Sequence, residues 1–221
     1  MKKQKEVRDF FPDIEQWRTV EEFMNWFEIG LTLLRKHAGD VETEVLMRKL
    51  DSQRKNTAKR VMEEVYALYN LLFDRKHEFI GCQVRNILGS QSYDVELQGH
   101  PKYKYIEIVS SCDGKQDAME RKQRLSPNWE SPVTVLESPQ SCVAPIVVQI
   151  ENALKKKLEK NCYTDEYALL IVFDAERVLI KPYQDELKKQ LEAKSWTFGV
   201  FQDIFIVGTA ANEKTYKLKH P

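Results

Sequence analysis

Apolar and polar positions follow helical spacing in the first part of the 221-residue chain. Between residues 19 and 37, apolar side chains recur every three or four residues, which predicts an amphipathic helix. The run Thr19-Val-Glu-Glu22 fits a capping box, in which the threonine caps the helix and the glutamate reaches back to it. The same spacing predicts a longer helix from Asp51 to about Lys76. The chain therefore opens with a helical region.

The period changes to two after His77, which favours strands. We predict a first strand over residues 79–89 and a second over 93–98, where Tyr93, Val95 and Leu97 alternate with polar residues. The pair His100-Pro101 breaks the pattern, because proline cannot continue a paired strand. A third strand is predicted over 103–110. Three successive strands joined by short turns indicate a meander.

The second half of the chain alternates helix and strand patterns. A helix is predicted over residues 143–160, and a second over 185–194. Between them, the continuous apolar run Tyr167–Phe173 is typical of a strand buried on both faces, so it should lie inside the sheet. Residues 198–207 and 215–218 are predicted as closing strands.

The order helix, strand, strand, strand, helix, strand predicts an α/β fold with a mixed sheet flanked by helices. We divide the chain into an N-terminal helical region, residues 1–51, and an α/β core, residues 52–221.

The composition of the chain limits which classes of function are compatible with it. Thirty-four basic residues balance 34 acidic ones, so any surface for nucleic acid must be local rather than global. No apolar run is long enough to span a bilayer, and the basic N-terminus lacks the apolar segment of a signal peptide, so no membrane partner is expected. The four cysteines are scattered; an even number is compatible with disulfides, but free thiols in a cytoplasmic protein fit the absence of a secretion signal.

Two charged residues interrupt apolar patterns. Glu107 shares one face of its predicted strand with Tyr105 and Val109, and a buried carboxylate needs an ion pair, hydrogen bonds or a metal. Lys157 lies inside the apolar stripe of the 143–160 helix, where it either snorkels to water or holds its ammonium group at the sheet. A purely structural role also remains open, with Glu107 paired to Lys157 or Lys104.

Asp94 at the end of one strand, Glu107 in the middle of the next and the order of elements resemble the PD-(D/E)XK nuclease-like (restriction-endonuclease-like) superfamily, over about residues 62–173. The resemblance implies a restriction-endonuclease-like core of order αβββαβ. It also implies that Asp94 and Glu107 bind Mg²⁺ or Mn²⁺. The family's lysine normally stands two residues after the glutamate, where this chain has Val109, and Tyr93 replaces the motif's proline.

In some members of that family the lysine has moved to the following helix, and Lys157 is the residue that we assign to that role, with Lys160 second. Gln149 corresponds to a helix glutamine found in several of these nucleases, and Glu64 to an additional acidic ligand. With the carbonyl of Ile108, the carboxylates would offer a partial shell of hard oxygen ligands. The alternative for Asp94 is that it only caps a strand end.

Three functions are compatible with these features. The first is a metal-dependent DNA endonuclease that hydrolyses phosphodiesters; the resemblance places such proteins in phage defence or on mobile elements. The second is a non-catalytic nuclease-like scaffold that binds nucleic acid or a protein partner, which the replacement of the motif lysine by Val109 favours. The third is an unrelated interaction protein that acts through its N-terminal helices. DNA is the expected partner, and a homodimer or a protein partner is left open.

Overall fold

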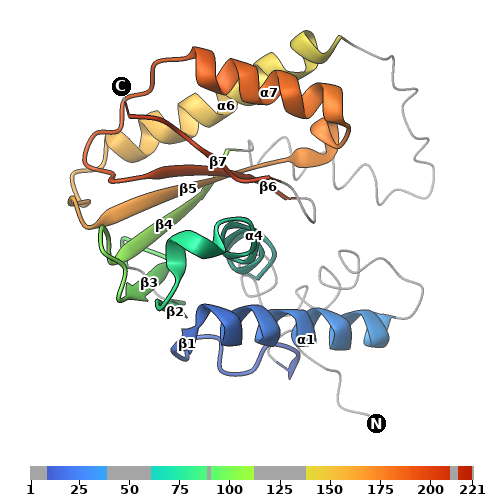
Figure 1. The fold of residues 1–221 in the computed structure, drawn as a ribbon, viewed down its shortest axis with the longest axis vertical. Coiled ribbons are helices and arrows are strands. Elements are labelled where there is room, and N and C mark those ends of the chain that lie inside the picture. The colour runs from blue at the N-terminus through green and yellow to red at the C-terminus, as the bar shows by residue number, and fades with distance from the viewer. Residues whose placement is uncertain (1–8, 39–60, 89–90, 112–137, 210–213, 221) are drawn as a thin grey trace.

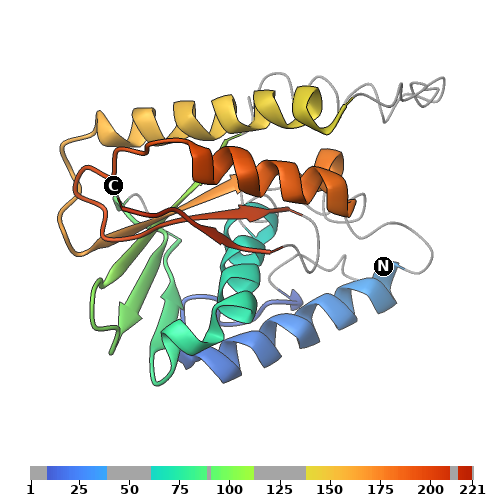
Figure 2. The same ribbon diagram turned by 45° about the horizontal axis from the view of Figure 1, so that its top comes forward.

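The computed structural model describes residues 9–38, 61–88, 91–111, 138–209 and 214–220. These residues form a seven-stranded mixed sheet with helices on both faces (Figure 1). Helices α1 (Val20–Ala38) and α4 (Tyr66–Asp74) cover one face, and α6 (Pro139–Leu158) and α7 (Lys181–Ala193) cover the other. Figure 2 shows α6 and α7 side by side above the sheet. The predicted α/β class with a mixed sheet flanked by helices is confirmed.

The strands lie in sequence order across the sheet. They are β1 (Arg18–Thr19), β2 (Gln83–Asn86), β3 (Val95–Gln98), β4 (Tyr105–Ser110), β5 (Tyr167–Phe173), β6 (Ile204–Gly208) and β7 (Tyr216–Lys217). Strands β1 to β4 pair antiparallel, β4, β5 and β6 pair parallel, and β7 returns antiparallel to β6. Short helical turns occur at Val61–Val65, Lys76–Phe79 and Ala175–Val178.

Strand β5 lies inside the sheet, as its apolar run predicts. It pairs with β4 on one side and β6 on the other, and all seven of its residues are buried. Ala168, Leu170 and Val172 belong to the core beneath α1 and α4. Leu169 and Ile171 belong to the core beneath α6 and α7. Because both faces are covered by helices, the strand has no polar side.

Several predicted boundaries differ from the observed ones, each for a local reason. The first strand is shorter than predicted, because Lys76–Phe79 forms a helical turn and Gly81 takes a left-handed φ of 78°. Helix α6 begins earlier than predicted, at Pro139, because Ser138 accepts a hydrogen bond from the amide of Ser141 at 3.2 Å. The closing strand starts at Ile204, since Gly199 takes a φ of 57° upstream of it.

Helix α1 packs onto the sheet through the same core as α4. The predicted capping box is confirmed: the Thr19 amide donates to the Glu22 carboxylate at 2.8 Å, and the Glu22 amide donates to the Thr19 hydroxyl at 3.2 Å. Phe23 and Phe27 lie in one cluster with Leu68 of α4. The predicted helix over 51–76 lies partly outside the described residues. No helix among the described residues is long and apolar enough to cross a membrane.

Candidate functional site

Glu107 lies in the middle of β4 and faces α6. Its strand neighbours Ile106 and Ile108 belong to the core beneath α1 and α4, whereas Tyr105 and Val109 pack against the opposite core. Strand alternation therefore turns Glu107 toward α6, where it is 7% exposed. A carboxylate at this depth needs a partner.

Lys157, in the last turn of α6, provides that partner. Its Nζ forms an ion pair with Oε1 of Glu107, and the two side chains are 12% and 9% exposed. The hydroxyl of Tyr163 donates to the same oxygen at 3.1 Å. The lysine thus does not snorkel to water; its ammonium group is held at the sheet.

Asp94 stands directly before β3 and links three strands. Its amide donates to the carbonyl of Ile106 at 3.1 Å, and its carbonyl accepts the amide of Ile87 at 2.8 Å. Its carboxylate oxygen Oδ2 accepts the amide of Ile108 at 2.8 Å, so Asp94 does cap the strand pair. Its charge also reaches Glu107, whose pKa it raises. Because Val95 pairs with Ile106, Asp94 lies opposite Glu107 on the neighbouring strand, and Glu107 in turn pairs with Lys157.

The environment of the cluster shifts the pKa values of Glu107 and Tyr163. Burial raises the pKa of Glu107 above its ordinary value, and the nearby Asp94 charge adds to this, while the contacts with Lys157 and Tyr163 oppose it. Burial and the Glu107 charge raise the pKa of Tyr163. A carboxyl group shifted by both burial and a second carboxylate is a common feature of active sites.

The remaining predicted site residues are not part of the contacts that Glu107 makes with Lys157 and Tyr163. Gln149 is on α6 but eight residues before Lys157, which separates them by about 12 Å along the helix axis. Lys160 is exposed beyond the end of α6, and its amide donates to the carbonyl of Lys157 at 3.2 Å. Glu64 is half-buried in the turn before α4. Ile108 was predicted to offer its carbonyl to a metal, but the contact that it makes with Asp94 is through its amide, which donates to the carboxylate.

The donor atoms suit a hard divalent ion only in part. Two carboxylates on adjacent strands are the ligand type that Mg²⁺ and Mn²⁺ take, and Mg²⁺ often uses just one or two protein carboxylates, completing its shell with water and substrate oxygens. Oε2 of Glu107 makes no hydrogen bond or ion pair within the described residues, since both contacts use Oε1. In the described part of the chain, no three His, Cys, Asp or Glu residues form a metal-binding group, so Glu64 does not complete one.

Sequence reasoning missed the tyrosines. Tyr163 lies in the connection between α6 and β5, where no periodicity exists to assign it a direction. The rings of Tyr93, Tyr105 and Tyr167 pack together beside it, with centroids 4.4 Å apart for Tyr93–Tyr105 and 5.0 Å for Tyr105–Tyr167. For Tyr105 a signal existed, because it shares a strand face with Glu107. These aromatic rings therefore pack against one side of the cluster.

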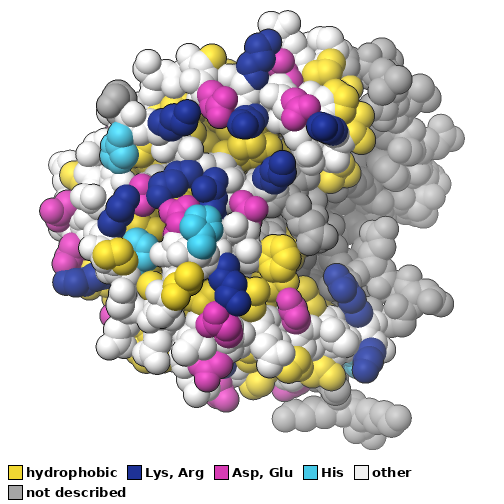
Figure 3. Space-filling model, in the orientation of Figure 1, with side chains coloured by type: hydrophobic (Ala, Val, Ile, Leu, Met, Phe, Trp, Pro, Cys, Tyr) yellow, Lys and Arg dark blue, Asp and Glu magenta, His cyan; other side chains and the backbone are white. Residues whose placement is uncertain are grey.

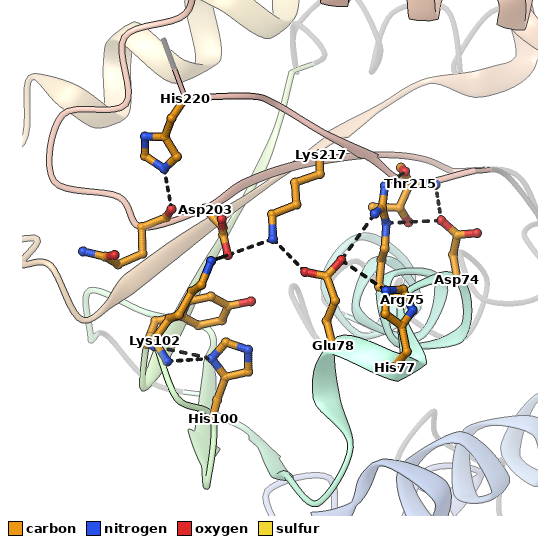
Figure 4. Close-up of polar contacts among 12 residues, drawn as sticks. Asp74, Arg75, His77, Glu78, His100, Lys102, Asp203, Thr215, Lys217 and His220 are labelled. Carbon is orange, nitrogen blue, oxygen red and sulfur yellow. Dashed lines mark hydrogen bonds and ion pairs between the residues drawn. The ribbon is translucent and has the colours of Figure 1, made fainter.

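A second charged cluster, also missed, joins β7 to β6 and to the turn after α4 (Figure 4). Lys217 pairs with Glu78 at 2.7 Å and with Asp203 at 3.0 Å. Burial lowers the pKa of the Lys217 ammonium group, but its two carboxylate partners outweigh burial and raise it. Lys102 approaches Asp203 at 3.7 Å, and Arg75 approaches Glu78 at 3.3 Å. Since every member has an opposite charge beside it, this cluster ties the edge of the sheet together.

Comparison of the chain with family models, with curated proteins and with solved structures gives no match. The functional argument therefore rests on the geometry above.

Proposed function

We propose that this protein is a metal-dependent DNA nuclease of the PD-(D/E)XK type, which hydrolyses phosphodiester bonds in cytoplasmic DNA. Asp94 and Glu107 are its metal carboxylates, and Lys157 takes the role of the motif lysine. The observation that carries the proposal is the ion pair between Glu107 and Lys157 beside Asp94. Without that convergence, the missing lysine at position 109 would argue against catalysis.

The order of elements around the cluster supports the same assignment. Among the described residues, helix α4, strands β2, β3 and β4, helix α6 and strand β5 occur in the order αβββαβ. The first three strands form an antiparallel meander, and β5 returns parallel to β4 after the α6 crossover. We infer a restriction-endonuclease-like core, with Asp94 directly before its second strand, Glu107 on its third strand and Lys157 on its second helix.

Each side chain has a definite task in this proposal. A bound Mg²⁺ or Mn²⁺ would polarise a phosphate and lower the pKa of its own water. Asp94 and Glu107 would hold the ion, with Tyr163 fixing the orientation of Glu107 through Oε1. Lys157 would move from Glu107 toward the phosphate, where its ammonium group offsets the charge that develops on the oxygens.

The non-catalytic scaffold is the second candidate, and a specific observation favours it. The side chains of Lys157 and Glu107 are only 12% and 9% exposed, so a phosphate needs a rearrangement to reach them. In this alternative, the ion pair is a buried structural contact and the chain binds nucleic acid or protein without cleaving it.

Cleavage of plasmid and single-stranded DNA with Mn²⁺ or Mg²⁺ separates the two candidates. The wild type should cut and Glu107→Gln should not, because the amide lacks the charge that holds the ion. Lys160→Met is the matched control, since Lys160 is exposed beyond α6 and should leave cleavage unchanged. Equal cleavage by wild type and Glu107→Gln would refute the site. DNA binding without cleavage by the wild type would favour the scaffold.

A further inference from the structure

A cleft of about 370 Å³ lies between β7, α7 and the end of α4, apart from the Glu107 cluster. Its wall is built by Asp74 and Arg75 at the end of α4, by α7 with the segment after it, and by residues 214–219 around β7. None of the candidate nuclease residues lines it. The volume falls in the range of small-ligand pockets.

The lining is strongly basic for a chain with no net charge. Its six basic residues are Arg75, Lys188, Lys194, Lys214, Lys217 and Lys219, against the two acids Asp74 and Glu192. Figure 3 shows lysine and arginine side chains gathered over α7 and β7 on this face. Four of these residues pair with carboxylates, namely Arg75, Lys188, Lys194 and Lys217, whereas Lys214 and Lys219 form no ion pair within the described residues. Two cations that form no ion pair in the described part of the chain favour an anionic ligand.

The wall of the cleft is held in place before any ligand arrives. Arg75 donates to the carbonyl of Thr215 at 2.8 Å, and the amide of Thr215 donates to Asp74 at 2.9 Å, as Figure 4 shows. Yet the Thr215 hydroxyl, on a residue 3% exposed, has no hydrogen-bond partner in the described part of the chain. A buried hydroxyl without a partner is unfavourable, so an acceptor atom from a ligand would relieve it.

Apolar side chains also line the cleft, between the charged ones. Leu191, Trp196 and Leu218 line it together with half-buried Tyr216. A ligand that uses the whole cleft therefore carries a compact anionic group and an apolar or aromatic part. Phosphate matches the anionic end, because it offers several acceptor oxygens to ammonium groups and to a hydroxyl.

We propose that this cleft binds a small phosphorylated molecule with an aromatic part, the chemical class of nucleoside phosphates. Lys214 and Lys219 contact the phosphates, and the apolar lining residues receive the ring. The Thr215 hydroxyl, which is buried in the free protein, turns to donate to one phosphate oxygen. The proposal is independent of the nuclease function, because the two sites share no residue.

Calorimetric titration with adenosine diphosphate, inorganic diphosphate and adenosine tests the assignment. We expect saturable binding of adenosine diphosphate with one site per chain, weaker binding of diphosphate and none of adenosine. Lys214→Gln/Lys219→Gln should weaken binding at least tenfold. Lys181→Gln/Lys189→Gln is the matched control, because it removes two α7 charges that do not line the cleft, and it should bind as the wild type does.

Thr215→Val separates binding from folding. It removes the unpartnered hydroxyl at nearly constant volume, so we expect unchanged or higher thermal stability together with weaker binding. No saturable binding of either phosphate compound would overturn the proposal, as would an equal loss in the control variant. Displacement of adenosine diphosphate by a DNA duplex, with a steep dependence on salt, would also overturn it and assign the surface to nucleic acid. Glu107→Gln should bind adenosine diphosphate normally.

Discussion

Lys157 of α6 and Glu107 of β4 form an ion pair across the interface between a helix and the sheet that it covers, with only 12% and 9% of the two side chains exposed. Tyr163 adds a hydrogen bond to the same carboxylate oxygen, and the Asp94 charge lies nearby. The pair therefore joins α6 to the sheet, and it is the contact on which the proposed nuclease function depends. In the proposed nuclease, it would also hold a cation beside a metal carboxylate.

The buried pair should show strong coupling between its members. Lys157→Met and Glu107→Gln should each destabilise the fold by roughly 3 kcal/mol, because each leaves a buried group without its partner. The double variant should lose less than the sum of the two. Urea unfolding measures all three. The exposed Lys104–Glu166 pair is the control, and Lys104→Met should change stability little. Additive losses at Lys157 and Glu107 would contradict the coupling.

The raised pKa of Glu107 predicts the sign of a pH effect. Because burial and Asp94 raise that pKa, the folded state binds more protons than the unfolded state above pH 4.5, so this group's contribution to stability falls as pH rises through the raised pKa. As the pH rises from 4.5 through the raised pKa, urea unfolding should therefore show that the wild type loses stability relative to Glu107→Gln. The measured quantity is the slope, against pH, of the difference in unfolding free energy between the two proteins. A flat difference, or one of opposite sign, would show that the Glu107 pKa is not raised.

The packing of Phe11 on α1 predicts that replacing Gly30 of this helix by alanine destabilises the fold. Alanine is usually better than glycine inside a helix by about 1 kcal/mol. At Gly30, however, a Cβ would meet the ring of Phe11 and lie 2.8 Å from the carbonyl oxygen of Phe10. We expect Gly30→Ala to destabilise by about 1–3 kcal/mol through overpacking. Asn25→Ala, at an exposed position of the same helix, should be slightly stabilising. Thermal unfolding compares the two, and a stabilised Gly30→Ala would show that Phe11 does not pack there.

Lys157→Met should separate metal binding from cleavage. Removing the ammonium group takes away a cation beside two carboxylates, so a divalent ion should bind at least as tightly as in the wild type. Cleavage should nevertheless be lost, because no cation remains to offset charge on the phosphate. Calorimetric titration with Mn²⁺ and plasmid cleavage measure the two effects. A variant that still cleaves at the wild-type rate would exclude a catalytic role for Lys157.

Periodicity predicted much of this fold because burial imposes it directly. The apolar run of β5 could only fit a strand covered on both faces, and the alternation in β4 turned Glu107 away from Ile106 and Ile108. Lys157 was predictable for the same reason, since the helix period placed a charge inside an apolar stripe. The placements of β5, Glu107 and Lys157 could be inferred from the spacing of apolar residues within a single element.

Residues in connections escaped prediction because no period gives them a direction. Tyr163 reaches Glu107 from the segment between α6 and β5, and Asp203 reaches Lys217 from the residue before β6. The basic cleft joins residues from α4, α7 and β7, whose proximity depends on the tertiary arrangement. Gln149 and Lys160 were assigned by resemblance, and the helix geometry leaves both outside the Glu107 cluster.

Metal-linked stability shows whether Asp94 and Glu107 bind a divalent ion, because a ligand that binds only the folded state raises the stability of that state. Thermal unfolding of the wild type should shift upward with Mn²⁺, reaching about 2.7 kcal/mol at an ion concentration one hundred times the Kd. Asp94→Asn and Glu107→Gln should abolish the shift, while Lys160→Met should keep it. A wild type that gains no stability from Mn²⁺ or Mg²⁺, or an equal gain in the Asp94 and Glu107 variants, would contradict a metal site at Asp94 and Glu107.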